Sequence, residues 1–222
     1  DVYISDHDNA CVRRVRGGII TAVAGICAYD SNGGYSGDGG PGTLAQLSYP
    51  SGLAFDLSGN LLIADTGNSV VRRLNFSTGI ITLVAGIPKS YGYSGDLGPP
   101  LAAELGEPTW LAVDAIGTIF ITDQTNNAIR YIRGNFIDTL AGVASQGFAG
   151  DGGRSLFAWL NTPAGLALDA SGNLFLADAE NNRVRKIALA GVPPPALSVS
   201  PSSLSFHVAQ GGDAPPSQFL LI

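Results

Sequence analysis

Short apolar runs follow one another along residues 1–188, and turns rich in Gly, Asn and Asp separate them. The runs GLAFD at 52–56 and LLIAD at 61–65, for example, are joined by a short polar turn at 57–60. No segment keeps the period of an amphipathic helix, and the runs are rich in β-branched residues. This pattern predicts an all-β fold made of short strands joined by tight turns.

The apolar runs belong to a repeat. The string GYSGDGG at 34–40 returns as GYSGDLG at 92–98 and as GFAGDGG at 147–153. Behind each string come an Ala-x-Leu-x-x-Pro pattern and two apolar runs that each end in Asp. An Asn follows the second Asp by three residues, and an Arg follows it by seven. Four apolar runs in each copy predict the four-stranded antiparallel blades of a β-propeller.

The phrase P-x-G-L-A-x-D-x-x-G-N-L-x-x-A-D-x-x-N-x-x-x-R at 163–185 resembles the NHL repeat in its long bacterial form, which carries an S-G-D-G-G-P insert. The resemblance covers residues 1–188, in two nearly complete copies and two partial ones. The copy at 108–130 departs from the phrase, because Trp110 replaces Gly and Thr118 replaces Asn. The resemblance implies a β-propeller used mostly as a binding platform, in a family whose members range from ligases to receptors and lyases.

The repeat predicts 3 + 4 + 4 + 3 strands, or about three and a half blades, over residues 1–190. A closed ring needs about four to eight blades, so we expect an incomplete propeller whose earlier blades are absent. Residues 191–196 contain three prolines and predict a stiff linker. Residues 197–222 alternate apolar and polar positions and resemble the start of an immunoglobulin-like or BACON-type domain, truncated well short of the roughly 100 residues of a sandwich.

The low number of basic residues argues against two classes of partner, nucleic acids and anionic membranes. The 222 residues include only 12 Lys and Arg, and the net charge is −6. Nucleic-acid binding and adsorption to an anionic membrane both require clustered basic residues, so neither is predicted. No apolar run approaches the roughly 18 residues of a membrane span.

Strand polarity predicts where a ligand binds. The inserts before the first strands and the turns between second and third strands share one end of the blades, here called the insert face. Long loops on a rigid scaffold commonly carry binding sites, so the insert face is the candidate. The candidate ligand-binding residues are Tyr35, Asp38, Tyr93, Asp96, Trp110, Phe148 and Asp151.

Each group of candidates has a second interpretation. The insert aspartates bind a metal or an anion, or else they accept backbone N–H bonds in tight turns, which we favour. The repeated arginines form hydrogen bonds between blades or contact a ligand. Trp110, with Phe157 and Trp159 of the next insert, stacks on a sugar or peptide side chain or packs beneath the insert. Asp6-His7-Asp8-Asn9 is the densest group of potential metal ligands, yet no metal or cofactor is predicted.

The cysteines leave two alternatives open. A hairpin turning near Gly17 and Gly18 brings Cys11 and Cys27 close, so they form a disulfide or remain two small thiols.

Histidine is scarce, with His7 in the propeller and His207 in the tail, and no Ser-His-Asp set is present. The sequence therefore favours a non-enzymatic, extracellular, periplasmic or cell-surface module that binds a protein or a glycan. The alternative is a fragment of a lyase or hydrolase whose catalytic residues lie in the absent blades. Open blade faces also predict self-association, because uncapped repeat arrays lose interface contacts at their ends.

Overall fold

The computed structural model describes residues 1–27 and 33–189, which belong to one compact unit, Asp1–Leu189. This part of the chain contains fourteen β-strands and five single-turn 3-10 helices, and no α-helix. The proposed linker and immunoglobulin-like domain at 191–222, with His207, lie outside the described residues.

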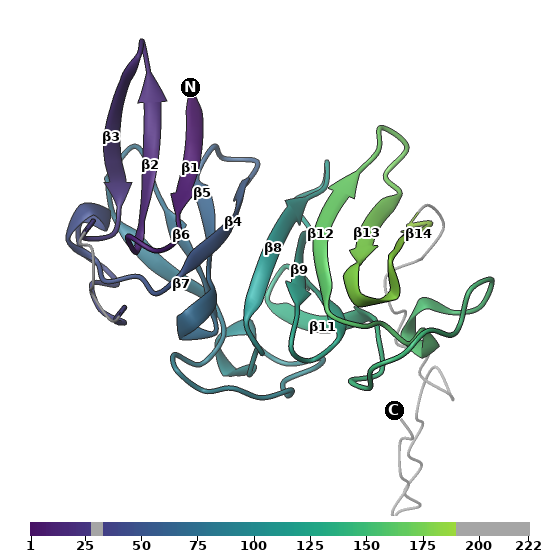
Figure 1. Ribbon diagram of the computed structural model, residues 1–222. Helices are drawn as coiled ribbons and strands as arrows, with labels where there is room; N and C mark the ends of the chain where they lie inside the picture. The colour runs from purple at the N-terminus through teal and green to yellow at the C-terminus, as the bar shows by residue number, and fades with distance from the viewer. Residues whose placement is uncertain (28–32, 190–222) are drawn as a thin grey trace, which may run out of the picture. The chain divides into compact units, whose positions relative to one another are not determined.

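The strands form four antiparallel sheets, and in each sheet the strands are hydrogen-bonded in chain order (Figure 1). The predicted all-β fold of antiparallel blades is thereby confirmed. The sheets are β1 (Val2–Asp6), β2 (Cys11–Arg16) and β3 (Ile19–Ala24); β4 (Pro50–Phe55), β5 (Leu61–Asp65), β6 (Val70–Leu74) and β7 (Ile81–Ala85); β8 (Pro108–Val113), β9 (Ile119–Asp123), β10 (Ala128–Arg133) and β11 (Phe136–Ala141); and β12 (Pro163–Leu168), β13 (Leu174–Asp178) and β14 (Arg183–Ile187).

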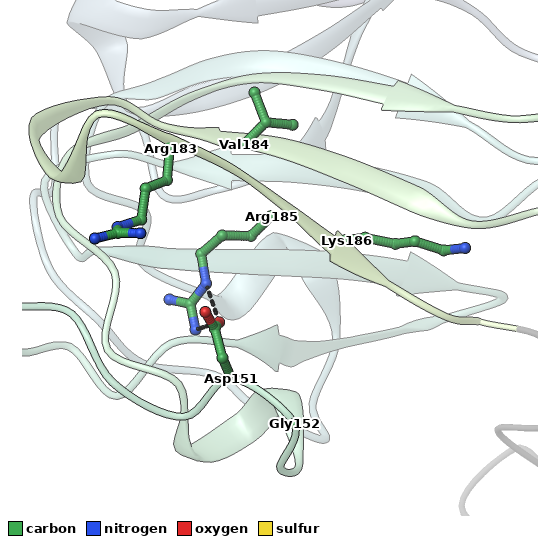
Figure 2. Close-up of a pocket in the computed structure, with 6 residues that line it drawn as sticks. All are labelled: Asp151, Gly152, Arg183, Val184, Arg185 and Lys186. Carbon is green, nitrogen blue, oxygen red and sulfur yellow. Dashed lines mark hydrogen bonds and ion pairs between the residues drawn. The ribbon is translucent and has the colours of Figure 1, made fainter.

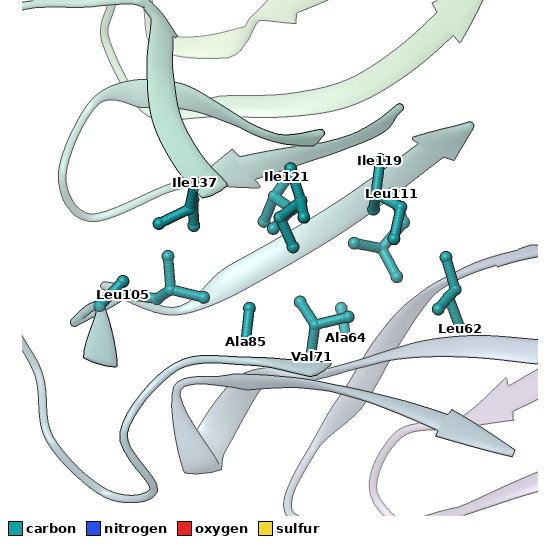
Figure 3. Close-up of a cluster of buried hydrophobic side chains, with 11 residues drawn as sticks. Leu62, Ala64, Val71, Ala85, Leu105, Leu111, Ile119, Ile121 and Ile137 are labelled. Carbon is teal, nitrogen blue, oxygen red and sulfur yellow. The ribbon is translucent and has the colours of Figure 1, made fainter. Parts of the chain in front are cut away.

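Consecutive sheets pack face to face through three apolar clusters. Because side chains alternate across a strand, every sheet has a leading face toward the preceding sheet and a trailing face toward the next one. Figure 3 shows the cluster in which Ala64, Val71 and Ala85 of the second sheet meet Ile119 and Ile137 of the third. Equivalent clusters join the first sheet to the second and the third to the fourth. Sheet-to-sheet burial is thus the main apolar contribution to this unit.

The first strands of successive sheets are neighbours, with β8 contacting both β4 and β12. A Cβ built on Gly52 of β4 would lie 2.7 Å from both the carbonyl oxygen and the Cα of the facing residues Thr109 and Trp110. Glycine at this position therefore permits close contact between two strand backbones. The predicted inner-strand residues lie on these strands: Leu53, Ala54, Leu111, Ala112, Leu166 and Ala167.

An insert leads into each of the last three sheets and contains a 3-10 turn. These turns are η1 (Gly42–Leu44), η3 (Pro100–Ala102) and η4 (Ser155–Phe157), whereas η2 (Thr66–Asn68) and η5 (Ala179–Asn181) connect second and third strands. The alanine and leucine of the Ala-x-Leu motif are buried between sheets, as Ala103 and Leu105 show. This sequence motif therefore anchors the insert in the apolar core.

Candidate ligand-binding surface

The inserts and the second-to-third-strand turns lie together, as strand polarity predicts. The Gly67 N–H donates to the Ser48 carbonyl at 2.9 Å, and the Tyr91 hydroxyl donates to the Gly67 carbonyl at 2.8 Å. The Thr125 N–H makes the corresponding bond to Gly106 at 3.0 Å. These contacts define the insert face in the described residues.

A buried arginine fastens each insert to the sheet that follows it. Arg72 on β6 is fully buried, and its Nε and Nη2 donate to Asp38 Oδ1 of the insert at 3.1 and 2.9 Å. The same guanidinium also donates to the backbone carbonyls of Ser36 and Gln46, both at 2.9 Å. One side chain therefore binds two stretches of insert backbone and one insert carboxylate.

The same arrangement occurs in the next two sheets. Arg130 Nη2 lies 2.5 Å from Asp96 Oδ1, and Arg185 Nη2 lies 2.6 Å from Asp151 Oδ1. In all three copies 34 residues separate the aspartate from its arginine, although the aspartates themselves are 58 and 55 residues apart. The constant separation identifies the ion pair as part of the repeat.

A second, fully buried aspartate completes each group. Asp65 at the end of β5 accepts the Ser48 N–H at 2.7 Å and the Asn68 side-chain amide at 2.9 Å, and it lies 3.6 Å from Arg72. Asn68 also donates to the carbonyl of Gly34 at 2.8 Å. Burial is the largest influence on this carboxyl and raises its pKa to about 6. We call this group of one arginine, two aspartates and one asparagine the clamp.

The equivalent clamps contain Asp123 with Asn126, and Asp178 with Asn181. Asp123 accepts the Gly106 N–H at 2.6 Å, and burial raises its pKa to about 6 as well. The first sheet has the part of the clamp that corresponds to Asp65, Asn68 and Arg72. Here Asn9 and Arg13 both donate to Asp6, at 2.7 and 3.2 Å.

An aromatic ring from the insert covers each buried arginine. The Arg72 guanidinium lies 4.9 Å from the centre of the Tyr35 ring, and Arg130 lies 5.0 Å from the centre of the Tyr93 ring. Phe148 is stacked with Arg185 at 5.2 Å and with Arg183 at 4.1 Å. The Tyr35 hydroxyl donates to Asp38, and burial together with this carboxylate raises the pKa of Tyr35.

Six of the seven predicted site residues therefore belong to the clamps or cover them. The insert aspartates accept arginine N–H groups rather than the turn N–H groups that we favoured. Aspartates that bind their own turns are found instead at the first-to-second-strand connections, where Asp56 accepts the Ser58 and Asn60 N–H groups at 3.0 and 2.9 Å. The arginines bind the insert of their own sheet instead of a neighbouring blade.

Trp110 is the seventh predicted residue and lies apart from the clamps. Its side chain on β8 is 46% exposed, and it pairs with Thr122 across the strands. Trp159 and Phe157 are exposed as well, but none of the three makes a ring–ring contact within the described residues. The aromatic cluster that does form joins Tyr3, Phe55 and Phe76, which are not among the predicted site residues.

Figure 2 shows a hollow along β14, lined by charged side chains. Arg183, Arg185 and Lys186 face it together with Asp151 and Gly152 of the insert. In the second and third sheets a fourth strand pairs with the strand equivalent to β14, and no such strand accompanies β14 in the described part of the chain. This hollow therefore lies at a strand edge, and of the candidate residues that the sequence predicts only Asp151 lines it.

The cysteines form a disulfide between Cys11 and Cys27, with their Cα atoms 5.1 Å apart. His7 contacts Asp8 at 2.7 Å, and within residues 1–27 and 33–189 no three metal-binding side chains converge. None of the helices in this same part of the chain has the length and apolar character of a membrane span.

Known proteins resemble this chain both in sequence and in fold. The NHL repeat model matches residues 160–187, which include η5 and all three strands of the fourth sheet. The protein SUPPRESSOR OF QUENCHING 1, chloroplastic, of Arabidopsis thaliana is 31% identical over 74% of this chain. The aligned region spans only 16% of that relative.

Solved structures resemble the fold at lower identity. A protein of unknown function from Bacteroides thetaiotaomicron has a TM-score of 0.66 at 21% identity, covering 84% of this chain and 44% of its own. An auxiliary nutrient binding protein from Bacteroides ovatus scores 0.57 at 19% identity, with the same coverage of 84% and 44%. A catalytically inactive virginiamycin B lyase from Staphylococcus aureus scores 0.52 at 16% identity, covering 85% and 49%. The chain spans about half of each of these structures or less, and together with the matched repeat they support an NHL-type β-propeller fold.

Proposed function

We propose that this chain is a non-enzymatic recognition module that acts outside the cytoplasm and binds a protein or glycan on its insert face. The observation that carries the proposal is the exposed indole of Trp110. The equivalent positions of the neighbouring first strands are Gly52 and Gly165, so the large ring is specific to one blade. Exposed aromatic rings supply the stacking surface that sugars and peptide side chains use.

The clamps support the proposal through rigidity. Each holds its insert by an ion pair and by bonds to two stretches of backbone, as Arg72 does with Asp38, Ser36 and Gln46. Loops fixed in this way lose little conformational entropy when they bind a partner. We therefore assign the clamp aspartates mainly to scaffolding and Trp110 to direct contact, and we assign Tyr93 and Phe148, which cover clamp arginines, to additional contacts.

The disulfide supports the proposed location. Structural disulfides persist in oxidising compartments and are rare in the cytosol. The Cys11–Cys27 bond joins β2 to the start of an insert. This feature fits a secreted, periplasmic or surface-exposed protein.

The proposal is tested by screening the 222-residue protein on a glycan array and in pull-downs with surface and secreted proteins. Trp110→Ala should weaken captured binding by about tenfold or more, because a central aromatic contact contributes about 1.4 kcal/mol or more. Phe136→Ala is the matched control, since Phe136 is an exposed aromatic at a third-to-fourth-strand turn on the opposite end of the sheet.

Equal loss of binding in both variants, or binding that Trp110→Ala leaves unchanged, contradicts the proposed site. Turnover of a captured ligand, followed by mass spectrometry, contradicts the non-enzymatic role.

A further inference from the structure

Two buried hydroxyl groups next to Trp110 have no hydrogen-bond partner in the part of the chain that the structure describes. They belong to Thr122 on β9, which is fully buried, and to Thr109 on β8, whose hydroxyl is shielded from solvent. Thr122 is the cross-strand neighbour of Trp110, and Thr109 precedes Trp110 in the chain. A buried hydroxyl without a partner is costly, because it has lost its hydrogen bonds to water and gained none in return.

The equivalent hydroxyl groups of the preceding sheets are bonded. Ser5, the equivalent of Thr122, donates to the Ser51 carbonyl of the next sheet. Ser51 in turn is the equivalent of Thr109, and its hydroxyl donates to the Thr109 carbonyl of the next sheet at 3.0 Å. By the same rule the hydroxyls of Thr109 and Thr122 belong on the backbone of β12 near Ala164, and neither bond is made.

The indole of Trp110 explains why these bonds are missing. At the preceding junction Gly52 lets β4 and β8 approach until a Cβ there would lie only 2.7 Å from backbone atoms of β8. Trp110 takes the equivalent position on β8, so its side chain prevents β12 from coming as close to β8. The two sheets are still joined beside this point, because the Asn127 side-chain oxygen accepts the Thr162 N–H at 2.9 Å.

Trp110 and Thr122 project from the same face of the third sheet. Phe120 of β9 packs in the cluster that joins the third sheet to the fourth, and Thr122, two residues on, shares this trailing face. Side chains of directly opposite residues lie on one face, so Trp110 shares it as well. The other chain neighbours of the two threonines are buried, whereas Trp110 is 46% exposed. Rotation of the indole is therefore the movement that opens both hydroxyls to a ligand.

We infer that this place binds one sugar residue of a glycan, which stacks on the Trp110 indole and bonds to the hydroxyls of Thr109 and Thr122. The C–H face of a sugar ring suits an aromatic ring, and each of its hydroxyls donates and accepts hydrogen bonds as a threonine hydroxyl does. Two shielded hydroxyls beside one indole favour such a compact, hydroxyl-rich ligand over a protein surface. The inference rests on the proposed function, which assigns Trp110 to direct contact, and narrows its ligand to a glycan.

Tryptophan fluorescence of the 222-residue protein tests the inference. The chain has two tryptophans, so the Trp159→Phe variant leaves Trp110 as its single fluorescent indole. Glucose, galactose, mannose, xylose and N-acetylglucosamine, and short oligosaccharides of each, are the probes. At least one should shift the Trp110 emission, and calorimetry then gives its affinity.

Valine variants of the two threonines test the hydrogen bonds. Thr109→Val and Thr122→Val should each weaken sugar binding by about tenfold, because each keeps the shape of the side chain and removes one hydrogen bond to the ligand. Thr82→Val, at an exposed threonine of β7, is the matched control and should leave the affinity unchanged.

Melting temperatures distinguish a ligand-binding hydroxyl from a structural one. Thr122→Val should keep or raise the melting temperature, because the hydroxyl that it removes has no partner in the fold. Thr66→Val should lower it, because the Thr66 hydroxyl donates to the Pro108 carbonyl at 2.7 Å. An equal decrease in both variants overturns the inference, since the Thr122 hydroxyl then serves the fold.

Two further results overturn the inference, namely no emission shift or binding with any of the sugars, and sugar binding that both valine variants leave unchanged. Either result leaves the proposed function standing where a captured protein depends on Trp110. Failure to capture any protein or glycan contradicts the proposed function itself, so the two failures are distinguishable.

Discussion

At the scale of single residues, the clamp arginines combine two roles that proteins usually separate. Arg72 neutralises two carboxylates, one fully buried and one partly exposed, while it also satisfies two backbone carbonyls of an otherwise irregular loop. Removing one partner of such a buried group is far more costly than removing a surface ion pair, because the remaining charge cannot be hydrated.

The first sheet supplies an internal comparison for this effect. Arg72→Gln should lower the free energy of unfolding by about 3–5 kcal/mol, because Asp65 then stays buried without its cation. Arg13→Gln, at the equivalent but partly exposed position, should cost only about 0–1 kcal/mol. Urea denaturation of both variants measures the difference, and equal losses would show that the clamp is no more than a surface ion pair.

The sequence contained both halves of this clamp without revealing that they meet. The repeated Asp of the insert and the repeated Arg of the third strand are both visible in the sequence. Two strands lie between them, so the sequence does not show directly that their side chains meet. Their constant spacing of 34 residues was the available signal. The exposure of Trp110 could not be predicted, because it depends on packing between elements that no local sequence pattern encodes.

At the scale of single elements, the first strands show how closely two blades approach. The backbone of β4 meets that of β8 at Gly52, whereas a Cβ on Gly165 of β12 would have no atom within 4 Å. The two glycines are equivalent in the repeat but differ in their surroundings, so they form a matched pair.

Gly52→Ala should destabilise the protein by about 1–3 kcal/mol, because a methyl group there overlaps backbone atoms that cannot move aside. Gly165→Ala should be neutral or slightly stabilising, since alanine lowers the entropy of the unfolded chain and meets no obstacle. Thermal melts of the two variants decide the matter, and a similar decrease in both would mean that strand propensity, not blade contact, determines the effect.

Strand existence and order could be predicted because apolar alternation and turn residues are local properties. The 3 + 4 + 4 + 3 arrangement appears in the described sheets as expected. The aromatic contact of Tyr3 with Phe55 and Phe76 could not be predicted, because it depends on where three elements of two sheets end relative to one another.

At the scale of the whole molecule, the buried carboxyls make the free energy of unfolding depend on pH. The pKa values of Asp65 and Asp123 are raised to about 6 in the folded state by burial. Their unfolded-state pKa is near 3.8, so between pH 4 and 6 the folded chain holds protons that the unfolded chain has released. Their contribution to stability is therefore greatest below about pH 4 and is lost as the pH rises through 6.

Urea denaturation between pH 4 and 7 tests this pH dependence. The stability of the wild type should decrease with rising pH relative to the double variant Asp65→Asn/Asp123→Asn, which lacks both titrating groups. Burial raises the pKa of Asp56, but its hydrogen bonds together outweigh burial, and hydrogen bonds also lower the pKa of Asp169. Both groups therefore affect stability below pH 4, outside this window. A difference between the two proteins that does not vary with pH would show that these carboxyls stay ionised throughout.

The constant spacing within the clamp also has a genetic consequence. The insert aspartate and the arginine that binds it always enclose the same 34-residue span, while the stretches 73–95 and 131–150 between one arginine and the next aspartate differ in length. A recombination crossover inside the span would separate a carboxylate from its arginine, and one between the arginine and the end of the fourth strand would divide the sheet, whereas a crossover just after the fourth strand transfers an intact insert and sheet. The heritable module of this protein is therefore the sheet with its preceding loop, and crossovers that add or remove copies are best tolerated between the end of a fourth strand and the start of the next insert.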